Sequence, residues 1–478
     1  MRSFVSVLFL FAAYILLVTA RHRKHVPQRP NILFLLADDL GWGDVEYNGG
    51  RADTPHLNAL AHGANSIQFT RFYSGAPVCS PTRGTVLTGR NHNRYCIWKA
   101  NTHSKDCNWT KDFQCPAKMP LPPSEVTVAE VLQTAGYRTG VFGKWHLGDL
   151  KHVENGHSRW SPSHPGMHGF DVWKVTERAV PTVNPNCACF DPETCRIGRY
   201  RKSALPACSN YYSNNVSSLP TPCPPHTNSR TVPSPPCPIV PHPNAILGDD
   251  SHFIVRELKS FINDSIASSH PFFAYVPFHA PHNRYIADTA YAMKYAEKGL
   301  KGKERDYYGS IEALDDSVGE ILAHLDAVGI RDTTMVWFTS DNGPAAGSPG
   351  STNGLEGEKG TLYEGGIRVP GILQWPAIIE ENMVSDYQVS TNDFLPTIVD
   401  ITNTRLPDSR ILDGSSILPF LLGVRTERLS AMHWAFKING DFSRKYTAVS
   451  IEGDLKLHAT SRTVRSQEAV CTTLLRTK

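Results

Sequence analysis

The stretch NILFLLADDLGWGD, residues 31–44, decides the fold class of this chain. Ile32 to Leu36 is an uninterrupted apolar run of strand length, which is the pattern of a strand buried in a parallel sheet. The run ends in two carboxylates, Asp38 and Asp39. We therefore expect an α/β fold in which functional groups follow the carboxyl ends of the strands.

Outward from this stretch, helical and apolar strand-like segments alternate. The segment VTVAEVLQTAGYRTGVFGKWHLG predicts a helix from about Val128, a stop at Gly136 and a strand over 139–142. TTMVWFTSDNG predicts another apolar strand, which ends in Asp341 and Asn342. The alternation indicates a large, mostly parallel central sheet flanked by helices.

Composition divides the chain into parts with different expectations. Residues 1–20, an apolar run that follows Arg2 and ends in VTA, predict a signal peptide, with an uncleaved membrane anchor as the alternative. Residues 28–418 are the expected main domain, and the Pro- and Cys-rich stretch 181–243 is expected to be a disulfide-tied insertion in it. In residues 419–478, MHWAFKI and YTAVSIEGDLKLHA predict strands of a small C-terminal α+β subdomain.

The bulk composition is typical of an exported protein without a nucleic-acid partner. A formal net charge of +3 over 478 residues is close to balanced. Export agrees with the 11 cysteines, most of which would pair in an oxidising compartment. Because that number is odd, at least one thiol is expected to lack an intramolecular partner, and Cys79 and Cys471 are the candidates. Sequons at Asn108, Asn215 and Asn263 agree with a glycoprotein.

Two acidic pairs, far apart in sequence, stand at predicted strand ends: Asp38 with Asp39, and Asp341 with Asn342. Taken singly, the first pair could cap a helix and the second could form a tight turn. Adjacent carboxylates at a buried strand end are costly unless a cation neutralises them. All four side chains offer oxygen, which favours Ca²⁺ or Mg²⁺ over zinc.

A set of basic side chains flanks the same strand ends or lies in glycine-rich loops: Arg83, Lys144, His146, His279 and Lys359. Arg83 lies four residues after Cys79, and so on the same face of a helix. Lys144 and His146 alternate at strand spacing. Each alone is more often a solvated surface residue. Together with a divalent cation they would form a pocket for a tetrahedral oxyanion such as phosphate or sulfate.

These residues resemble a known family. CSPTRGTVLTGR, residues 79–90, matches the sulfatase signature, and the likeness extends in the family's order through DDLGWGD, TPHLNALA, GKWHLG, HAP, SDNG and GEKGTLYEGGIRVP. It covers the chain from about Pro30 to Leu422. The chain is most similar to arylsulfatases and N-acetylgalactosamine-6-sulfatases of the alkaline-phosphatase-like superfamily. The resemblance implies that fold, with residues 28–418 as the catalytic domain.

The resemblance also implies a modification of Cys79. In this family the formylglycine-generating enzyme oxidises the signature cysteine to Cα-formylglycine in the endoplasmic reticulum. One hydroxyl of the hydrated aldehyde attacks sulfur and displaces the alcohol. The other hydroxyl then loses its proton, which expels sulfate and regenerates the aldehyde. A serine would lack this second hydroxyl.

The remaining roles are likewise implied by the resemblance. One Ca²⁺ per chain would be held, together with the formylglycine at position 79, by Asp38, Asp39, Asp341 and Asn342. Arg83 would stabilise the hydrated aldehyde, and Lys144 and Lys359 would neutralise the sulfate oxygens. His146 would take the proton of the second hydroxyl, and His279, with Lys359, would protonate the leaving oxygen.

The expected substrates are sulfate monoesters, either aryl sulfates or sulfated sugars. The expected location is the secretory pathway, with delivery to the lysosome or outside the cell, and the chain could associate as a homo-oligomer. Two departures stand out: the run after HGFD, residues 168–171, and the end after GDLKLHAT, where the C-terminal subdomain looks truncated. The alternatives are a phosphatase or phosphodiesterase of the same superfamily, or an inert exported glycoprotein. A phosphatase would favour Ser or Thr at position 79 and histidine-rich zinc sites.

Overall fold

The computed structural model describes twelve stretches of the chain: residues 29–100, 120–148, 150–154, 157–160, 163–178, 180, 182–183, 211–214, 239–241, 249–437, 446–461 and 471–476. The expected signal peptide, the sequons at Asn108 and Asn215, and most of the insertion at 181–243 lie outside these residues. Asn263 lies within them.

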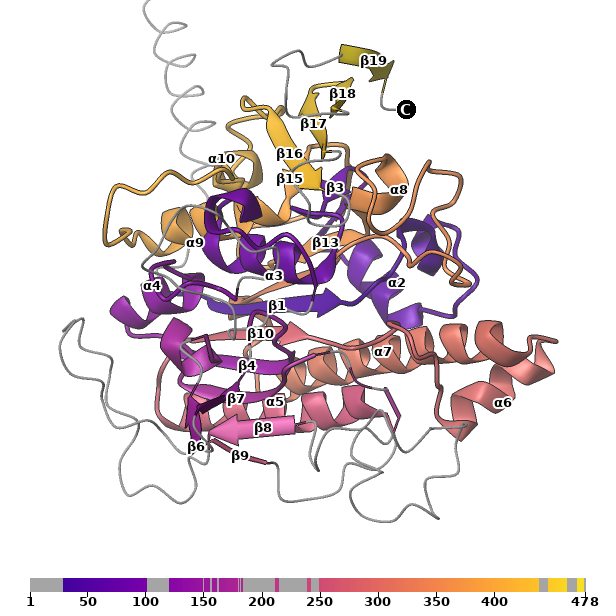
Figure 1. The fold of residues 1–478 in the computed structure, drawn as a ribbon. Helices are drawn as coiled ribbons and strands as arrows, with labels where there is room; N and C mark the ends of the chain where they lie inside the picture. Colours follow the sequence, from indigo (N-terminus) through magenta and orange to yellow (C-terminus); the bar gives the residue numbers. More distant parts are fainter. Residues whose placement is uncertain are drawn as a thin grey trace, which may run out of the picture.

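A mixed sheet of ten strands forms the centre of the molecule (Figure 1). In spatial order its strands are β14 (Met383–Ser385), β2 (Ser66–Phe69), β13 (Gly371–Gln374), β11 (Thr334–Ser340), β1 (Asn31–Ala37), β10 (Phe272–Pro277), β4 (Arg138–Lys144), β7 (Val172–Thr176), β8 (Tyr211–Asn214) and β9 (Ile239–Pro241). The strands from β11 to β7 in this order are parallel to one another. This arrangement confirms the predicted α/β fold with a large, mostly parallel sheet.

The alternating faces of β1 explain its uninterrupted apolar sequence. Phe34 and its neighbours two residues away pack into one core cluster, whereas Leu33 and Leu35 pack into a second cluster on the opposite face. A strand that is buried on both faces has no position for a polar side chain until it ends. The first carboxylates therefore come directly after Ala37, at the carboxyl end of the strand.

Helices cover both faces of the sheet. The first cluster includes side chains of α3 (Cys79–Thr88), α4 (Val128–Thr134), α9 (Phe394–Thr402) and α10 (Leu418–Leu421). The second includes side chains of α2 (Pro55–His62), α5 (Asp250–Ala267), α6 (Thr289–Glu297) and α7 (Gly302–Ala327). The short helices are α8 (Glu364–Ile367), η1 (Trp42–Asp44), η2 (Glu46–Asn48), η3 (His92–Tyr95), η5 (Pro165–His168), η9 (Arg331–Thr333) and η10 (Thr391–Asp393).

The predicted helix from Val128 is confirmed, and its start has a local cause. The Thr127 hydroxyl accepts the Glu130 N–H, while the Glu130 carboxylate accepts the Thr127 N–H, which is a reciprocal capping box. Gly136 follows with a positive φ of 76°, as predicted for the stop. The strand expected over 139–142 extends further, to Arg138–Lys144.

The described residues also form three smaller sheets. One contains β12 (Arg368–Val369), β3 (Phe72–Tyr73) and β15 (Val389–Ser390), and another contains β5 (Lys151–Glu154) and β6 (His157–Trp160). The last contains β16 (Met432–Lys437), β17 (Tyr446–Glu452), β18 (Leu455–Ser461) and β19 (Cys471–Arg476). The last of these, the C-terminal sheet, is antiparallel throughout and contains the strands predicted from MHWAFKI and YTAVSIEGDLKLHA. Its Trp434 and Ile451 pack with Tyr73, Leu362 and Ile367 in a third apolar cluster.

The insertion contributes to the main sheet, which its sequence did not indicate. Strands β8 and β9 lie within 181–243 and continue the sheet beyond β7 by antiparallel pairing. They are four and three residues long, too short to produce a clear period-two pattern.

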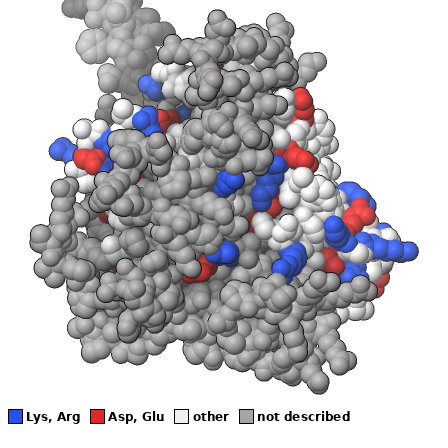
Figure 2. All heavy atoms as spheres, viewed as in Figure 1, with Lys and Arg blue, Asp and Glu red and all other residues white. Residues whose placement is uncertain are grey.

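The visible surface shows mixed charge (Figure 2), and the described helices include no candidate membrane span. On the face in Figure 2, blue basic and red acidic side chains lie next to one another where described residues are visible, in agreement with the nearly balanced net charge. Within the described ranges, none of the helices combines the length and the apolarity needed to cross a bilayer.

Candidate active site

The carboxyl ends of four neighbouring parallel strands bring the predicted residues together. Strands β11, β1, β10 and β4 lie side by side, so the segments that follow them meet at one edge of the sheet. Backbone hydrogen bonds connect these segments: Asp38 N–H donates to Ala280 O at 3.0 Å, and Asp341 N–H donates to Ala37 O at 3.1 Å. The two acidic pairs therefore become neighbours, although about 300 residues separate them in sequence.

The four oxygen-bearing side chains form one buried cluster. Asp341 Oδ1 accepts the backbone N–H of Asp39 at 3.1 Å, and Asn342 Nδ2 donates to Asp39 Oδ1 at 2.7 Å. Asn342 Oδ1 is buried and has no hydrogen-bond partner among the described residues. Asp39 has a left-handed backbone, with φ at 65°, which is uncommon outside glycine and is often retained at functional sites.

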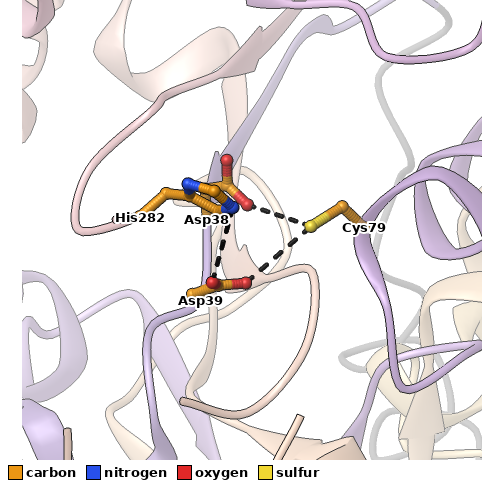
Figure 3. A group of neighbouring side chains, drawn as sticks. All are labelled: Asp38, Asp39, Cys79 and His282. Carbon is orange, nitrogen blue, oxygen red and sulfur yellow. Dashed lines mark hydrogen bonds and ion pairs between the residues drawn. The ribbon is translucent and has the colours of Figure 1, made fainter. Parts of the chain in front are cut away.

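Cys79 faces this cluster from the first position of α3. Its Sγ lies 3.3 Å from Asp38 Oδ1 and 3.8 Å from Asp39 Oδ1 (Figure 3). In the described part of the chain Cys79 is a free, buried thiol, whereas Cys96 is in a disulfide. This confirms Cys79 as a cysteine without an intramolecular disulfide.

Three cations surround the carboxylates and the thiol. The Arg83 guanidinium, one helical turn after Cys79, donates from Nε and Nη2 to Asp341 Oδ2 at 3.1 and 2.8 Å. Lys144 Nζ donates to Asp38 Oδ2 at 2.5 Å. Lys359 Nζ donates to Asp39 at 2.5 and 2.7 Å and lies 3.4 Å from Cys79 Sγ. Side chains from α3, the end of β4 and the glycine-rich loop are thus brought together around Cys79 and the carboxylates.

Charge and burial compete at these groups. Burial raises the pKa of Asp38, but Lys144 and the other cations outweigh it and hold that pKa well below its usual value. For Asp341, burial and the neighbouring Asp38 outweigh Arg83 and raise the pKa to about 7. Burial, together with Asp341 and Asp38, raises the pKa of Cys79 well above that of an ordinary thiol. Three carboxylates thus face three cations in this cluster, and burial together with the nearest charges sets the pKa of each group.

The two predicted histidines differ in position. His146 is buried, and burial together with Lys144 and Arg83 holds its pKa well below normal, so the imidazole is neutral. His279 is also buried, but the contacts seen for its ring are with Thr176 Oγ1 at 2.7 Å from Nε2 and Asp250 Oδ2 at 2.7 Å from Nδ1. Its ring is thus directed to the ends of β7 and α5, while its backbone lies beside the acidic cluster.

His282 was not singled out from the sequence, yet it lies in the cluster. Its Nε2 is 3.7 Å from Asp39 Oδ2, and Figure 3 shows its ring beside both carboxylates. One ligand atom each from Asp38, Asp39, Cys79 and His282 lies within 4.8 Å of the others. The HAPH segment contains both histidines, and its backbone turn decides which ring meets the carboxylates. That turn leaves no periodic signal in the sequence.

The side chains present fit a hard divalent cation. Several oxygens converge within a buried space, and one of them, Asn342 Oδ1, has no protein partner in the described structure. Burial, and next the charge of Asp38, raise the pKa of Asp341, and a cation bound beside Asp341 would favour its ionised form. Carboxylate and amide oxygens are the ligands that Ca²⁺ and Mg²⁺ prefer.

Comparison with known proteins agrees with this geometry. The family model described as Sulfatase matches residues 30–404. N-acetylgalactosamine-6-sulfatase of Mus musculus is 32% identical over 404 residues, which cover 83% of this chain and 67% of that protein. Arylsulfatase G of Canis lupus familiaris is 31% identical over 437 residues, covering 88% and 72%. The chain spans about two thirds of the length of the N-acetylgalactosamine-6-sulfatases that it matches.

Solved structures show the same fold. The crystal structure of Ps i-CgsB in complex with k-i-k-neocarrahexaose superposes with a TM-score of 0.71 at 23% identity, covering 92% of this chain and 85% of that one. The PsFucS1 sulfatase from Pseudoalteromonas sp. superposes with a TM-score of 0.67 at 23% identity, covering 96% and 84%.

Proposed function

This chain belongs to the sulfatase family of sulfuric ester hydrolases, and from that membership we propose that it hydrolyses sulfate monoesters through a Cα-formylglycine formed from Cys79 and a bound Ca²⁺. The observation that carries the proposal is the surrounding of Cys79, a buried free cysteine between carboxylates and Lys359. Aryl sulfates and sulfated sugars are the proposed substrate class.

The electrostatics of Cys79 support a modified side chain. The thiolate is the nucleophilic form of cysteine, and here burial and two carboxylates raise the pKa of the thiol well above normal. The unmodified thiol is therefore a weak nucleophile, whereas a hydrated formylglycine would bring oxygen nucleophiles to the same position.

The cations would bind and stabilise the sulfate group. Asp38, Asp39, Asp341 and Asn342 would hold Ca²⁺, which when bound would act as a Lewis acid toward a sulfate oxygen. Lys359 lies at the boundary between these carboxylates and Cys79, so its ammonium can turn from Asp39 to a substrate oxygen. Lys144 is fixed on Asp38, and Arg83 on Asp341, where they keep the acidic cluster compensated.

Two histidines would move protons. His146 is neutral because its pKa is depressed, so it can accept the proton of the second hydroxyl. The Thr176 hydroxyl donates to Arg178 O and therefore accepts from His279 Nε2–H, which places a proton on that nitrogen. For His279 to protonate the leaving oxygen with Lys359, this N–H must exchange Thr176 for the substrate.

The cellular context follows from the modification. Formation of formylglycine requires passage through the endoplasmic reticulum and contact with the formylglycine-generating enzyme, so we place the protein in the secretory pathway, lysosomal or secreted. The catalytic domain would comprise 28–418, with 419–478 as the C-terminal subdomain.

The test is co-expression with the formylglycine-generating enzyme, followed by mass spectrometry of the peptide around position 79 and assays with matched nitrophenyl sulfate and phosphate. We expect an aldehyde in place of the thiol and a preference for the sulfate ester. Cys79→Ser should fold normally but lose turnover. Full activity of the serine variant would refute the nucleophile, and a strong preference for phosphate would refute the substrate class.

A further inference from the structure

A lysine of the C-terminal sheet is buried against the loop that carries Lys359. Lys456, on β18, is only 2% exposed, and its Nζ donates to Glu364 Oε1 at 2.7 Å. The neighbours of Lys456 along the strand, Leu455 and Leu457, are exposed instead. Lysine is rarely buried in this way unless it is paired, so the inward orientation of Lys456 calls for an explanation.

Glu364 connects this lysine to the main domain. The Tyr73 hydroxyl donates to Glu364 Oε2 at 3.2 Å, and Arg368 Nη1 lies 3.5 Å from the same oxygen. Both carboxylate oxygens are therefore engaged by groups from different elements. Glu364 begins α8 and lies near the end of the glycine-rich loop 356–366, whose last residues form the start of that helix, so fixing its carboxylate fixes this end of the loop.

The loop 356–366 touches both halves of the candidate active site. Gly360 N–H donates to Pro77 O at 2.8 Å, two residues before Cys79, and Lys359 N–H donates to Pro344 O at 3.0 Å. Gly343 N–H, next to Asn342, donates to Gly366 O at 3.0 Å. A displacement of this loop would thus move Lys359 and also disturb the segment that holds Asn342.

A second contact from β18 reaches the same loop. The rings of His458 and Tyr363 stack with centroids 4.8 Å apart and planes at 11°. His458 lies two residues after Lys456 and so on the same face of β18. This face contacts two consecutive residues of the loop, Tyr363 through a ring and Glu364 through a charge.

We propose that Lys456 is a positioning residue of the sulfatase reaction: through Glu364 it holds loop 356–366 so that Lys359 stands between Asp39 and residue 79. The proposal rests on the proposed function in assigning Lys359 to the sulfate group. Stability alone does not account for the lysine, because the apolar cluster of Trp434, Ile451 and Leu362 already joins the C-terminal sheet to the loop. A buried ion pair at such a junction adds little net stability over an apolar pair but fixes geometry.

The test compares Lys456→Met with Asp454→Asn. Asp454 lies on the same β17–β18 hairpin and pairs with Arg71 at 2.8 Å, and its side chain is 80% exposed, whereas Lys456 is buried. Lys456→Met should lower kcat on an aryl sulfate roughly 10- to 100-fold, since small misplacements of a charge-stabilising group have effects of this size. KM should change less than threefold, because Lys359 acts mainly on charge that develops in the transition state. Asp454→Asn should keep kcat within about twofold.

Hydrogen exchange gives a readout that does not require turnover. The amides of Gly360 and Gly365 should exchange roughly tenfold faster in Lys456→Met, while amides of β1 should be unchanged. If the variant does not fold, Glu364→Gln tests the same contact from the other side, with the same expected changes. Unchanged exchange and unchanged kcat in the folded variant, or an equal loss in Asp454→Asn, would overturn the proposal. If the wild type has no sulfatase turnover, the proposed function fails, and the exchange measurement still decides whether Lys456 holds the loop.

Discussion

Arg83 shows how one side chain can organise a crowded site. Its fork donates to Asp341 from two nitrogens and to Lys144 O from the third at 2.7 Å. Burial would lower the pKa of Arg83, but Asp341 and Asp38 outweigh it and keep the guanidinium charged. A planar group with several fixed donors can connect the segment after β11 with the end of β4, which a single ammonium cannot do.

Arg83→Lys should therefore destabilise the protein and abolish most activity. The ammonium cannot reach Asp341 and Lys144 O together, so a buried carboxylate or carbonyl is left without its partner. Loss of a buried charge partner costs about 3 to 5 kcal/mol, and a lysine that keeps part of the charge should fall at the lower end, about 3 kcal/mol. The free energy of unfolding in urea measures this change.

Arg94→Lys is the matched control for this prediction. Arg94 also forms a two-nitrogen pair, with Asp413 at 2.6 and 2.7 Å, but at a partly exposed position. Its replacement should cost no more than about 1 kcal/mol. Equal losses of stability in the two variants would show that burial does not determine the importance of Arg83.

Individual site residues were predictable where they follow a recognisable element. Asp38 and Asp341 directly follow apolar strands, and Arg83 shares a helix face with Cys79, so periodicity and spacing placed them. His282 and Asp250 were not found. The first depends on the turn after β10, and the second lies at the helix start after a stretch of chain without periodicity.

At the scale of elements, the start of α5 holds a carboxyl group, that of Asp249, whose ionised form the fold disfavours. Asp249 caps this helix by accepting the Ser251 N–H at 2.8 Å, while its Oδ2 is buried without a hydrogen-bond partner in the described structure. Burial, and next the adjacent Asp250, raise the pKa of Asp249 to about 8. The capping bond alone does not offset these two effects.

The raised pKa of Asp249 makes its contribution to the stability of the fold depend on pH. The folded protein keeps Asp249 protonated up to about pH 8, whereas an unfolded aspartate ionises near pH 4. The folded state therefore binds more protons between these values, and the contribution of Asp249 to stability, complete below about pH 4, is lost as pH rises to 8.

Asp249→Asn should remove this dependence while keeping the cap, because asparagine is an equally good N-cap residue. Relative to the wild type, the variant should gain stability from pH 5 to pH 8, on the order of a few kcal/mol, measured by denaturant unfolding at both pH values. Asp264→Asn, on the exposed side of the same helix, should change stability by less than about 0.5 kcal/mol at either pH. A pH-independent difference for Asp249→Asn would contradict the assigned pKa.

Buried helices and strands were easier to predict from the sequence than exposed or edge strands. Strands β1, β10 and β11 are covered on both faces and read as apolar runs, and α4 carries its own capping box. The edge strand β14 exposes Met383 and Val384 and, among the described strands, pairs with β2 alone. Its short sequence therefore has no pattern that indicates a buried face. Strand β8 is ordered by pairing with β7, and β9 by pairing with β8, although their composition gives no strand signal.

At the scale of the whole molecule, the acidic cluster joins distant parts of the chain. Its members follow β1 and β11, and residue 79 and Lys359 approach from α3 and loop 356–366. These parts contact one another through charged groups at the edge of the sheet. Any ion that binds only to the assembled cluster must stabilise the whole fold, because the unfolded chain does not hold these groups together.

We expect Ca²⁺ to raise the stability of the protein and chelation to lower it. At a free Ca²⁺ concentration about 100 times Kd, binding to the native state alone adds about 2.7 kcal/mol, and the midpoint of thermal unfolding should rise accordingly over that in excess chelator. Asp341→Asn should bind Ca²⁺ more weakly and lose most of the difference in unfolding midpoint between Ca²⁺ and chelator. Among the described residues, a second group of candidate metal ligands, His56, Asp315 and Asp316, provides the control. Asp315 accepts the N–H groups of His56 and Leu57 at 3.0 and 2.7 Å and thus holds the start of α2. Asp316→Asn should leave the calcium-dependent shift of the unfolding midpoint intact. Identical midpoints with and without Ca²⁺, or loss of the shift in Asp316→Asn, would show that the cluster at the edge of the main sheet is not where the ion stabilises the fold.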